Sequence, residues 1–277
     1  MRAAQSAKRG VARLLPFRQS GRFTFRLLFP GECEICGIEL TEVSRIPVCS
    51  ACLNKPYSKP AEFACSTCGT PFLNDWPLRP DGRCALCRTG AAGFEGAYSF
   101  GPYDEPLSQL IHLFKYRRVR TLARPLGELL HRALPQNGQF DAIVPVPLHW
   151  RKQWKRGFNQ SLFLAQELRR HTGLPVIQGL RRQRFTAAQA GLTNSQRRHN
   201  VASAFAIRNA QQVAGKKILL IDDVMTTGST LAAAANVLRR AGAARVTVLT
   251  LARADRRAPS AISSRIPPNQ LAVSGAS

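Results

Sequence analysis

Hydrophobic positions between residues 91 and 253 follow two alternating patterns. Leu107, Leu110, Ile111 and Phe114 recur at helical spacing and place one apolar face on a helix. Residues 218–221 form a continuous apolar run, which is typical of a central strand in a parallel sheet. The same criteria predict helices at 107–116, 122–134, 159–171 and 229–241, and strands at 97–100, 142–146, 218–221 and 246–251. Because strands alternate with helices, we expect an α/β fold whose parallel sheet is flanked by helices.

Composition divides the chain into four segments. Residues 1–30 are a basic arm, and residues 254–277 lack an apolar period, so we expect both to be disordered. Residues 31–90 hold all eight cysteines among many turn-forming residues. Residues 91–253 form the predicted α/β domain. Within it, the stretch 178–204 is polar, basic and rich in Gln, which favours an inserted flap over a strand–helix unit.

The eight cysteines form four pairs, each with two residues between its members. Such a spacer lets two sulfurs of a tight turn face one tetrahedral ion, and two turns complete a site. The pattern predicts two structural zinc sites, with iron in the same geometry as an alternative. Sequential pairing is favoured over a cross-braced arrangement, because each half then closes as an independent ribbon. The expected ligands are Cys33, Cys36, Cys49 and Cys52, then Cys65, Cys68, Cys84 and Cys87.

The chain is strongly basic, with a formal net charge of +24 at pH 7. Such a surface attracts polyanions, although solubility or a genome that favours Arg is an alternative explanation. No apolar run reaches about 18 residues, so no membrane span is expected. The basic segment at the start lacks the unbroken apolar core of a secretory signal. We therefore expect a cytoplasmic protein with reduced thiols.

Residues 218–230 combine an apolar strand, two acids and a hydroxyl-rich turn that opens a helix. In open α/β sheets, ligands bind at the carboxyl ends of the strands, where Asp222 and Asp223 lie. The free N–H groups of a helix start hold a phosphate well. Two carboxylates would repel that phosphate unless they serve another part of the ligand, such as vicinal ribose hydroxyls or a hydrated Mg²⁺ ion. A simple helix start is the alternative, but the pattern is more specific than a cap.

A second loop follows the predicted strand at 142–146. Cations beside a tight turn can hold a diphosphate, whereas an ordinary polar loop is the alternative. The candidates in this loop are Pro147, Leu148, His149, Arg151 and Lys152.

Aromatic and basic residues are interleaved after this loop. Trp150, Trp154 and Phe158 lie at helical spacing among cations. Rings of this kind can stack on bases while the cations neutralise phosphates, but they can equally pack in the domain core. The candidate nucleic-acid contacts are Lys115, Lys155, Arg156 and Phe158.

The run 218–230 resembles the signature of type I phosphoribosyltransferases that binds phosphoribosyl pyrophosphate (PRPP). The resemblance implies PRPP with Mg²⁺ as the ligand, ribose hydroxyls held by Asp222 and Asp223, and a 5′-phosphate wrapped by residues 225–230. The implied PRPP-binding residues are Asp222, Asp223, Val224, Met225, Thr226, Thr227, Gly228, Ser229 and Thr230. Several purine-base transferases carry an acid at the position of Thr226, so this chain does not favour a purine acceptor.

Further motifs resemble the ComF family of ComFC-type competence proteins. They are Phe29-Pro30, Tyr103 to Lys115-Tyr116, Val144 to Leu148, Arg156 to Gln160, and Arg184, Thr186, Gln189, Leu192, Arg197 and Asn200 in the flap. The resemblance implies a double zinc ribbon joined to a type I phosphoribosyltransferase domain. It also implies a role in natural transformation, with single-stranded DNA and competence-machinery proteins as partners. The flap is also similar to that of glutamine amidophosphoribosyltransferase, whose glutaminase half has no counterpart in this sequence.

Three functions are compatible with these features. The first is a PRPP-binding protein that handles single-stranded DNA in natural transformation. The second is a phosphoribosyltransferase with an unknown acceptor, in which the flap closes over PRPP. The third is a regulator in which PRPP controls nucleic-acid binding without turnover. No residue clearly activates a nucleophile, since His112, His149 and His199 are candidates only by residue type.

Overall fold

The computed structural model describes residues 31–40, 44–55, 62–72, 74–75, 78–90, 92–150, 154, 156–183 and 204–254. The predicted arm at 1–30, and the predicted tail at 254–277 apart from its first residue, lie outside the described residues. The chain divides into two compact units, Met1–Leu53 and Asn54–Ser277. The larger unit holds the predicted α/β domain together with the second group of cysteines.

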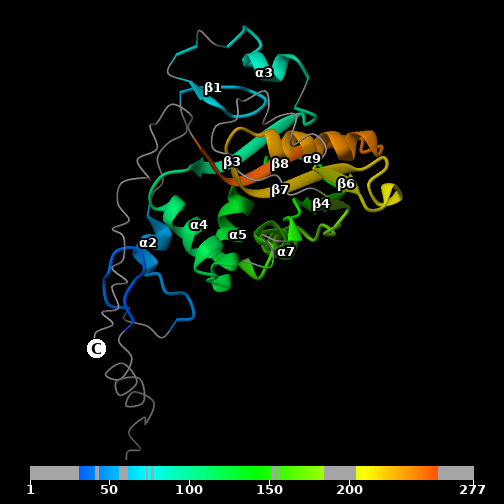
Figure 1. The fold of residues 1–277 in the computed structure, drawn as a ribbon. Helices are drawn as coiled ribbons and strands as arrows, with labels where there is room; N and C mark the ends of the chain where they lie inside the picture. Colours follow the sequence, from blue (N-terminus) through cyan, green and yellow to red (C-terminus); the bar gives the residue numbers. More distant parts are fainter. Residues whose placement is uncertain are drawn as a thin grey trace, which may run out of the picture. The chain divides into compact units, whose positions relative to one another are not determined.

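A parallel sheet of four strands forms the centre of the larger unit (Figure 1). The strands are β3 (Gly96–Pro102), β4 (Ala142–Pro145), β7 (Lys217–Met225) and β8 (Arg245–Arg253), in the spatial order β3-β8-β7-β4. Ile218 of β7 pairs with Ala142 on one side and Val246 on the other. Because β7 has neighbours on both sides and helices on both faces, residues 218–221 are apolar and buried.

Helices cover both faces of this sheet (Figure 1). One face carries α4 (Leu107–Tyr116), α5 (Ala123–Arg132) and α7 (Gln160–Thr172), and the other carries α9 (Ser229–Arg240). This division follows from the direction of the chain. After α7 the chain forms a parallel bridge at Val176, outside β4, whereas α9 leads from β7 the opposite way to β8. Right-handed crossovers in opposite directions place their helices on opposite faces.

Shorter elements complete the described structure. An antiparallel hairpin is formed by β5 (Leu180–Arg182) and β6 (Phe205–Ile207). The cysteine-rich segments contain α2 (Ser50–Asn54), β1 (Phe63–Ala64), β2 (Pro71–Phe72) and α3 (Ala85–Arg88). Two short 3-10 helices, η1 (Arg120–Leu122) and η2 (Ala210–Gln212), precede α5 and β7.

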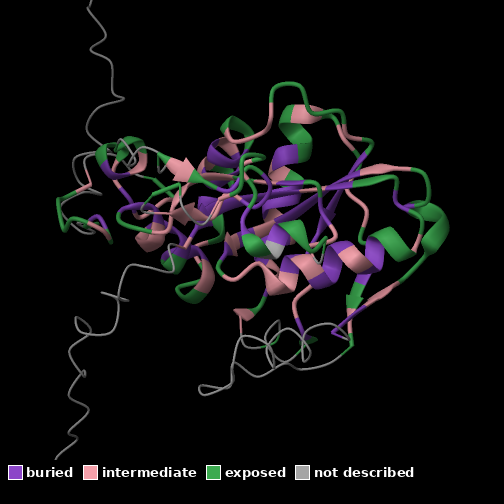
Figure 2. Ribbon diagram, turned by 90° about the horizontal axis from the view of Figure 1, so that it is seen from above, coloured by how far each residue is buried: buried purple, intermediate pink, exposed green. Residues whose placement is uncertain are grey.

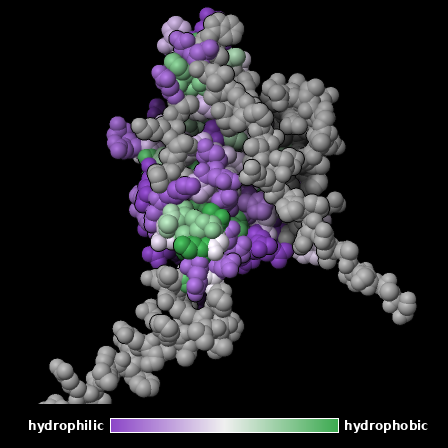
Figure 3. Space-filling view, turned by 90° about the vertical axis from the view of Figure 1, so that its left-hand side faces the viewer, coloured by the Kyte–Doolittle hydropathy of each residue, from purple (hydrophilic) through white to green (hydrophobic). Residues whose placement is uncertain are grey.

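The core is formed by the apolar faces that the sequence predicts. Leu107, Leu110, Ile111 and Phe114 of α4 are buried, as are residues 218–221 of β7. Figure 2 shows buried residues concentrated along the sheet and on the helix faces next to it. On the face drawn in Figure 3, the described surface is mostly hydrophilic around a small hydrophobic group. Among the described helices, none is both long enough and apolar enough to cross a membrane.

Two differences from the predicted elements affect the site. The strand predicted at 218–221 extends through Met225, so both aspartates lie within β7 rather than in the loop after it. The predicted flap at 178–204 is not entirely irregular, because it contains β5, which pairs with β6. The arginines of β5 obscured this strand in the hydrophobic pattern. Residues 184–203 of the predicted flap lie outside the described part of the chain.

Candidate functional site

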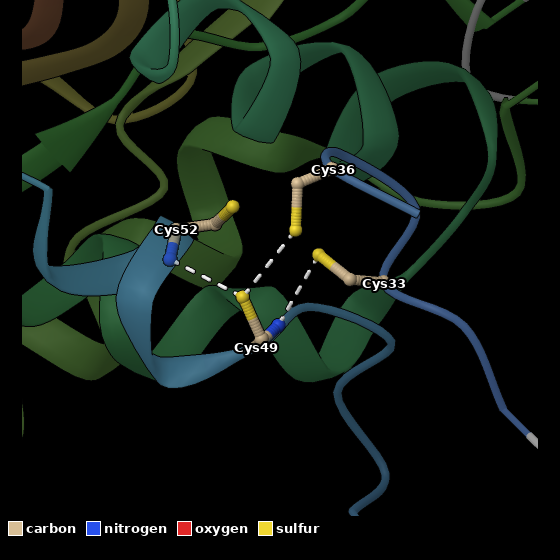
Figure 4. Close-up of side chains that lie close together, drawn as sticks. All are labelled: Cys33, Cys36, Cys49 and Cys52. Atoms are coloured by element: carbon tan, nitrogen blue, oxygen red, sulfur yellow. Dashed lines mark hydrogen bonds between the residues drawn. The ribbon is translucent and has the colours of Figure 1, made fainter. Parts of the chain in front are cut away.

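Two groups of four cysteines bring their sulfur atoms together. The four sulfurs of each group lie within 4.8 Å of one another, and Figure 4 shows those of the first group turned toward a common centre. Four sulfurs held about 2.3 Å from a tetrahedral ion would be about 3.8 Å apart. The sulfurs of Cys36 and Cys49 are 3.7 Å apart, and those of Cys68 and Cys84 are 3.8 Å apart. Each quartet could therefore hold a zinc ion, and the grouping is that of sequential pairing.

Equivalent turns build the two quartets. Gly37 and Gly69 follow the second cysteine of each quartet with φ values of 72° and 62°, a region that favours glycine. The N–H groups of Cys49 and Cys84 each donate to the sulfur of the first cysteine of their quartet, at 3.3 Å. A donor that faces a sulfur favours its thiolate form, which is the form that binds a metal.

The thiols of each quartet differ in acidity. Burial alone would raise the pKa of Cys33, but backbone donors, Cys49 foremost, lower it to about 6. The hydrogen bond from Cys87 lowers the pKa of Cys68 to about 4. Burial raises the pKa of Cys52. A bound cation would favour the thiolate form of all four sulfurs in a quartet.

The central strand β7 leads into a turn at the carboxyl edge of the sheet. Met225 is the last residue of β7, and α9 begins at Ser229. Gly228, between them, adopts a left-handed conformation with φ 74°. Thr227 Oγ1 accepts a hydrogen bond from the Ser229 N–H at 3.3 Å and lies 2.9 Å from Ser229 Oγ. The first N–H groups of α9 carry partial positive charge, so this turn can stabilise an anion.

Asp222 and Asp223 extend from β7 to different partners, which belong to two helices on the same face of the sheet. Asp222 Oδ1 accepts from Ser161 Oγ, at the start of α7, at 2.8 Å. Asp223 Oδ1 lies 2.8 Å from Lys115 Nζ on α4, and the side chains of this ion pair are only 11% and 13% exposed. The acidic pair is therefore held from two helices.

Burial and charge change the pKa values at this edge. Loss of water raises the pKa of Asp222 to about 7, and the Asp223 carboxylate adds to this effect. Burial alone would lower the pKa of Lys115, but the Asp223 carboxylate raises it overall. Burial likewise raises the pKa of the Tyr103 hydroxyl. Lys115 is therefore charged, whereas Asp222 can exchange a proton near neutral pH.

The second predicted loop begins at the same edge. β4 pairs with β7, and the Val146 N–H donates to the Ile221 carbonyl at 2.9 Å. Pro147 and Leu148 are half-buried, and His149 is buried. The structure thus brings the start of the predicted diphosphate loop to the edge that carries the acidic pair. Its cations Arg151 and Lys152 lie outside the described residues.

Comparison with known proteins assigns the chain to a family. The family model described as "Phosphoribosyl transferase domain" matches residues 130–275. Competence protein F of Haemophilus influenzae is 32% identical over 220 residues, which cover 76% of this chain and 93% of that protein. The chain belongs to the ComF family.

Other relatives agree with this assignment. "DNA utilization protein YhgH" of Salmonella typhimurium is 36% identical over 234 residues, covering 82% of this chain and 99% of that protein. Competence protein ComFC of Bacillus subtilis is 28% identical over 214 residues, covering 74% of this chain and 84% of that protein. The parallel sheet with flanking helices and the cysteine quartets are the architecture expected of the family.

A weaker likeness links the ComF-family chain to a solved structure. Glutamine PRPP amidotransferase from B. subtilis is 24% identical, with a TM-score of 0.34. The likeness covers 47% of this chain and 26% of that one, so the ComF-family chain spans about a quarter of its length.

Two predicted nucleic-acid contacts of this ComF-family protein have other roles. Lys115 forms the ion pair with Asp223. Phe158 is only 4% exposed, and its ring centroid lies 5.2 Å from that of Phe114 and 5.0 Å from that of Phe163. The structure thus gives Lys115 an ion pair and Phe158 a place in the core, and their contact with nucleic acid stays a prediction. The sequence could have indicated that Lys115 is buried, because it follows Ile111 by four residues on the buried face of α4.

Other aromatic rings of the ComF-family protein are exposed. Tyr116, Trp150 and Trp154 have exposed fractions of 56%, 63% and 86%. The Arg156 guanidinium lies 5.1 Å from the centroid of the Tyr116 ring, within the range of a cation–π interaction. Arg156 is thus the predicted nucleic-acid contact that the structure places beside an exposed ring. The candidates Lys155, Arg184, Thr186, Gln189, Arg197 and Asn200 lie outside the described residues.

Two further polar residues near the acidic pair were not predicted from the sequence. Ser161 donates to Asp222, as described above. Burial lowers the pKa of Arg182 on β5, whereas the Asp222 carboxylate raises it, so the hairpin reaches toward the acidic pair. Both lie more than 35 residues from Asp222 in sequence, so only the fold reveals the proximity.

Proposed function

We propose that this ComF-family protein binds PRPP at the carboxyl edge of β7 and handles single-stranded DNA in natural transformation. One observation carries the first part of the proposal: the acidic pair on β7 is followed directly by a left-handed Gly228 turn into α9. The carboxylates can accept hydrogen bonds from sugar hydroxyls, and the N–H groups at the start of α9 can donate to a phosphate. This order matches the two parts of a sugar phosphate. The phosphoribosyltransferase match over residues 130–275 supports the same ligand class.

Each part of the ligand has a chemical counterpart at this edge. The N–H groups at the start of α9, with the hydroxyls of Thr227 and Ser229, suit the 5′-phosphate. The carboxylates of Asp222 and Asp223 suit the ribose hydroxyls and, through water, a Mg²⁺ ion. The loop that begins at Pro147 suits the diphosphate. Lys115 balances the charge of the acidic pair, so that an anionic ligand can approach.

A ligand-side experiment tests this assignment. Calorimetry would compare ribose 5-phosphate with 2-deoxyribose 5-phosphate, which lacks one hydroxyl, and with inorganic phosphate. We expect the deoxy sugar to bind at least about tenfold more weakly, because a buried carboxylate loses a partner. Inorganic phosphate should bind more weakly still. Equal affinities for all three ligands would contradict recognition of the ribose.

The second part of the proposal rests on charge and on exposed rings. The net charge of +24 attracts a polyanion, and the exposed rings of Tyr116, Trp150 and Trp154 offer stacking surfaces. Two relatives are named as a DNA utilization protein and a competence protein. We extend these roles to this chain and place it in the cytoplasm, with proteins of the competence machinery as further partners.

Zinc is the metal that we propose for both quartets. Four sulfur ligands at tetrahedral spacing suit Zn²⁺, and they leave no open position for catalysis. Elemental analysis of the purified protein should find two zinc ions per chain. Iron in stoichiometric amounts would contradict this identity while leaving the sites themselves intact.

Phosphoribosyl transfer is the second candidate function. It is favoured by the proximity of Arg182 to Asp222, since Arg182 belongs to β5, which lies within the predicted flap at 178–204. A closing flap would exclude water from the reacting ribose carbon. Incubation with PRPP, Mg²⁺ and a panel of bases, ammonia and DNA should release pyrophosphate if transfer occurs. PRPP binding without release, together with a change in DNA affinity, would instead support a PRPP-sensing regulator.

A further inference from the structure

The second cysteine quartet is built into the same core as the phosphate turn. The four cysteines are 2% to 8% exposed and belong to one buried cluster with Met225 and Leu231. The Ala97 N–H of β3 donates to the Thr67 carbonyl at 2.7 Å, which fixes the turn between the first two cysteines to the edge of the sheet. The second quartet is therefore packed into the core of the α/β domain.

Arg253 links this quartet to the end of β7. It is the last residue of β8 and pairs in the sheet with Met225. The next residue, Ala254, donates its N–H to the Met225 carbonyl at 3.0 Å. The Arg253 guanidinium donates to Thr70 Oγ1, which lies 2.9 Å from the sulfur of Cys68. Arg253 is only 6% exposed, so these contacts are shielded from water.

Met225 continues the link to the turn itself. Its side chain is 2% exposed. A Cβ on Gly228 would lie 2.7 Å from Met225 Cε, so this side chain fills the space against the turn. A closely packed interior transmits small displacements instead of absorbing them. A change at the quartet can thus reach Gly228 through Thr70, Arg253 and Met225.

We infer that Arg253 is a positioning residue through which the second cysteine quartet, with its metal ion, controls the shape of the phosphate turn. The quartet fits such an ion by its four sulfurs and their spacing. The consequence for ligand affinity rests on the proposed function, whereas the consequence for the turn does not. The coupling is reciprocal, so a ligand at the turn also strengthens metal binding at this quartet.

The test uses the full zinc-loaded chain and removes one contact while keeping all eight sulfurs. Thr70→Val removes the acceptor of Arg253, and Arg253→Met removes the donor with little change in volume. Ser66→Ala is the matched control, since Ser66 Oγ donates to the Asp81 carbonyl and lies in the same turn as Thr67. Hydrogen exchange of the amides at 226–229 is measured without ligand, and ribose 5-phosphate affinity is measured by calorimetry. Urea unfolding verifies that each variant is folded.

Both link variants should speed exchange at 226–229 and weaken ribose 5-phosphate binding by about fivefold, the effect of one lost buried hydrogen bond. Ser66→Ala should change neither. In the wild type, saturating ribose 5-phosphate should raise the zinc affinity of the second quartet in a chelator titration, and Thr70→Val should abolish that rise. Unchanged exchange at the turn in both link variants would overturn the inference. If the wild type does not bind ribose 5-phosphate, the proposed function fails, and the exchange measurement still decides the link.

Discussion

Lys115 Nζ lies 2.8 Å from Asp223 Oδ1, and both side chains are largely buried. This ion pair joins α4 to the end of β7, next to the turn that we assign to phosphate binding. The lysine holds one carboxylate in place and offsets its charge, while the other carboxylate receives the Ser161 hydroxyl. The site is thus organised before a ligand arrives, which reduces the entropic cost of binding.

Loss of Lys115 should destabilise the fold. Lys115→Met leaves the Asp223 carboxylate buried without its partner, a change that typically costs about 3 kcal/mol. We expect urea unfolding to show a loss of this size. The double variant Lys115→Met with Asp223→Asn should recover part of it, because no unpaired charge then remains.

Lys217→Met is the matched control for this experiment. Lys217 donates to Gln139 Oε1 at 2.7 Å in an exposed setting, so its loss should cost less than about 0.5 kcal/mol. Equal stability of Lys115→Met and Lys217→Met would show that the buried ion pair adds no stability.

Asp222 should make stability depend on pH. Its pKa is raised in the folded chain to about 7, so the folded state binds a proton that the unfolded state releases at lower pH. Stability from this group is therefore fully present at low pH and is lost as pH rises toward 7. The stability of Asp222→Asn relative to the wild type should rise between pH 4 and pH 8 by about 1 kcal/mol or more. A stability difference that is the same at both pH values would refute the raised pKa.

The turn at Gly228 can be tested with a paired glycine. Gly215 and Gly228 have similar positive φ values of 70° and 74°, but a Cβ at Gly215 would meet nothing within 4 Å. Both alanine variants should lose about 1 kcal/mol from backbone strain. Gly228→Ala alone should also abolish ribose 5-phosphate binding, because its Cβ would displace Met225 at the turn. Retained binding in Gly228→Ala would show that the turn does not contact the phosphate.

The exposed tryptophans provide a test of DNA binding. Trp150→Ala with Trp154→Ala should weaken binding to single-stranded DNA by about tenfold or more, since stacking on a ring contributes about 1–3 kcal/mol per base. Tyr98→Ala is the control, because Tyr98 is an exposed ring (43%) on β3. Fluorescence anisotropy over a range of salt would measure both effects. Affinity that is insensitive to salt would contradict an electrostatic contribution.

The sequence predicted the elements better than the contacts between them. The apolar pattern predicted α4 and β7 because burial of one face of a helix, or of both faces of a strand, determines which positions are apolar. The short strand β5 left no such trace, since Arg181 and Arg182 occupy two of its three positions. The hairpin depends on pairing with β6, which follows a long insertion. Short strands with distant partners are set by tertiary context, not by local pattern.

The candidate site shows the same limit. The cysteine spacing and the run at 218–230 were informative because each cysteine pair, and the strand with its turn, is formed by residues close together in sequence. The partners of the acidic pair come from α4 and α7, far away in sequence, so the sequence did not reveal that Lys115 and Ser161 contact the aspartates. The structure also shows Phe158 in the core and Trp150 at the surface, although both lay in the same helical pattern.

The most direct test of the account is calorimetric titration of PRPP, with Mg²⁺, into the wild type and two variants. The double variant Asp222→Asn with Asp223→Asn removes the proposed ribose contacts. Asp141→Asn is the control, because Asp141 accepts from the Lys217 N–H at the opposite end of β7. We predict that the double variant stays folded and loses at least about tenfold in affinity, while Asp141→Asn binds like the wild type. Undiminished PRPP binding by a folded double variant would contradict the account.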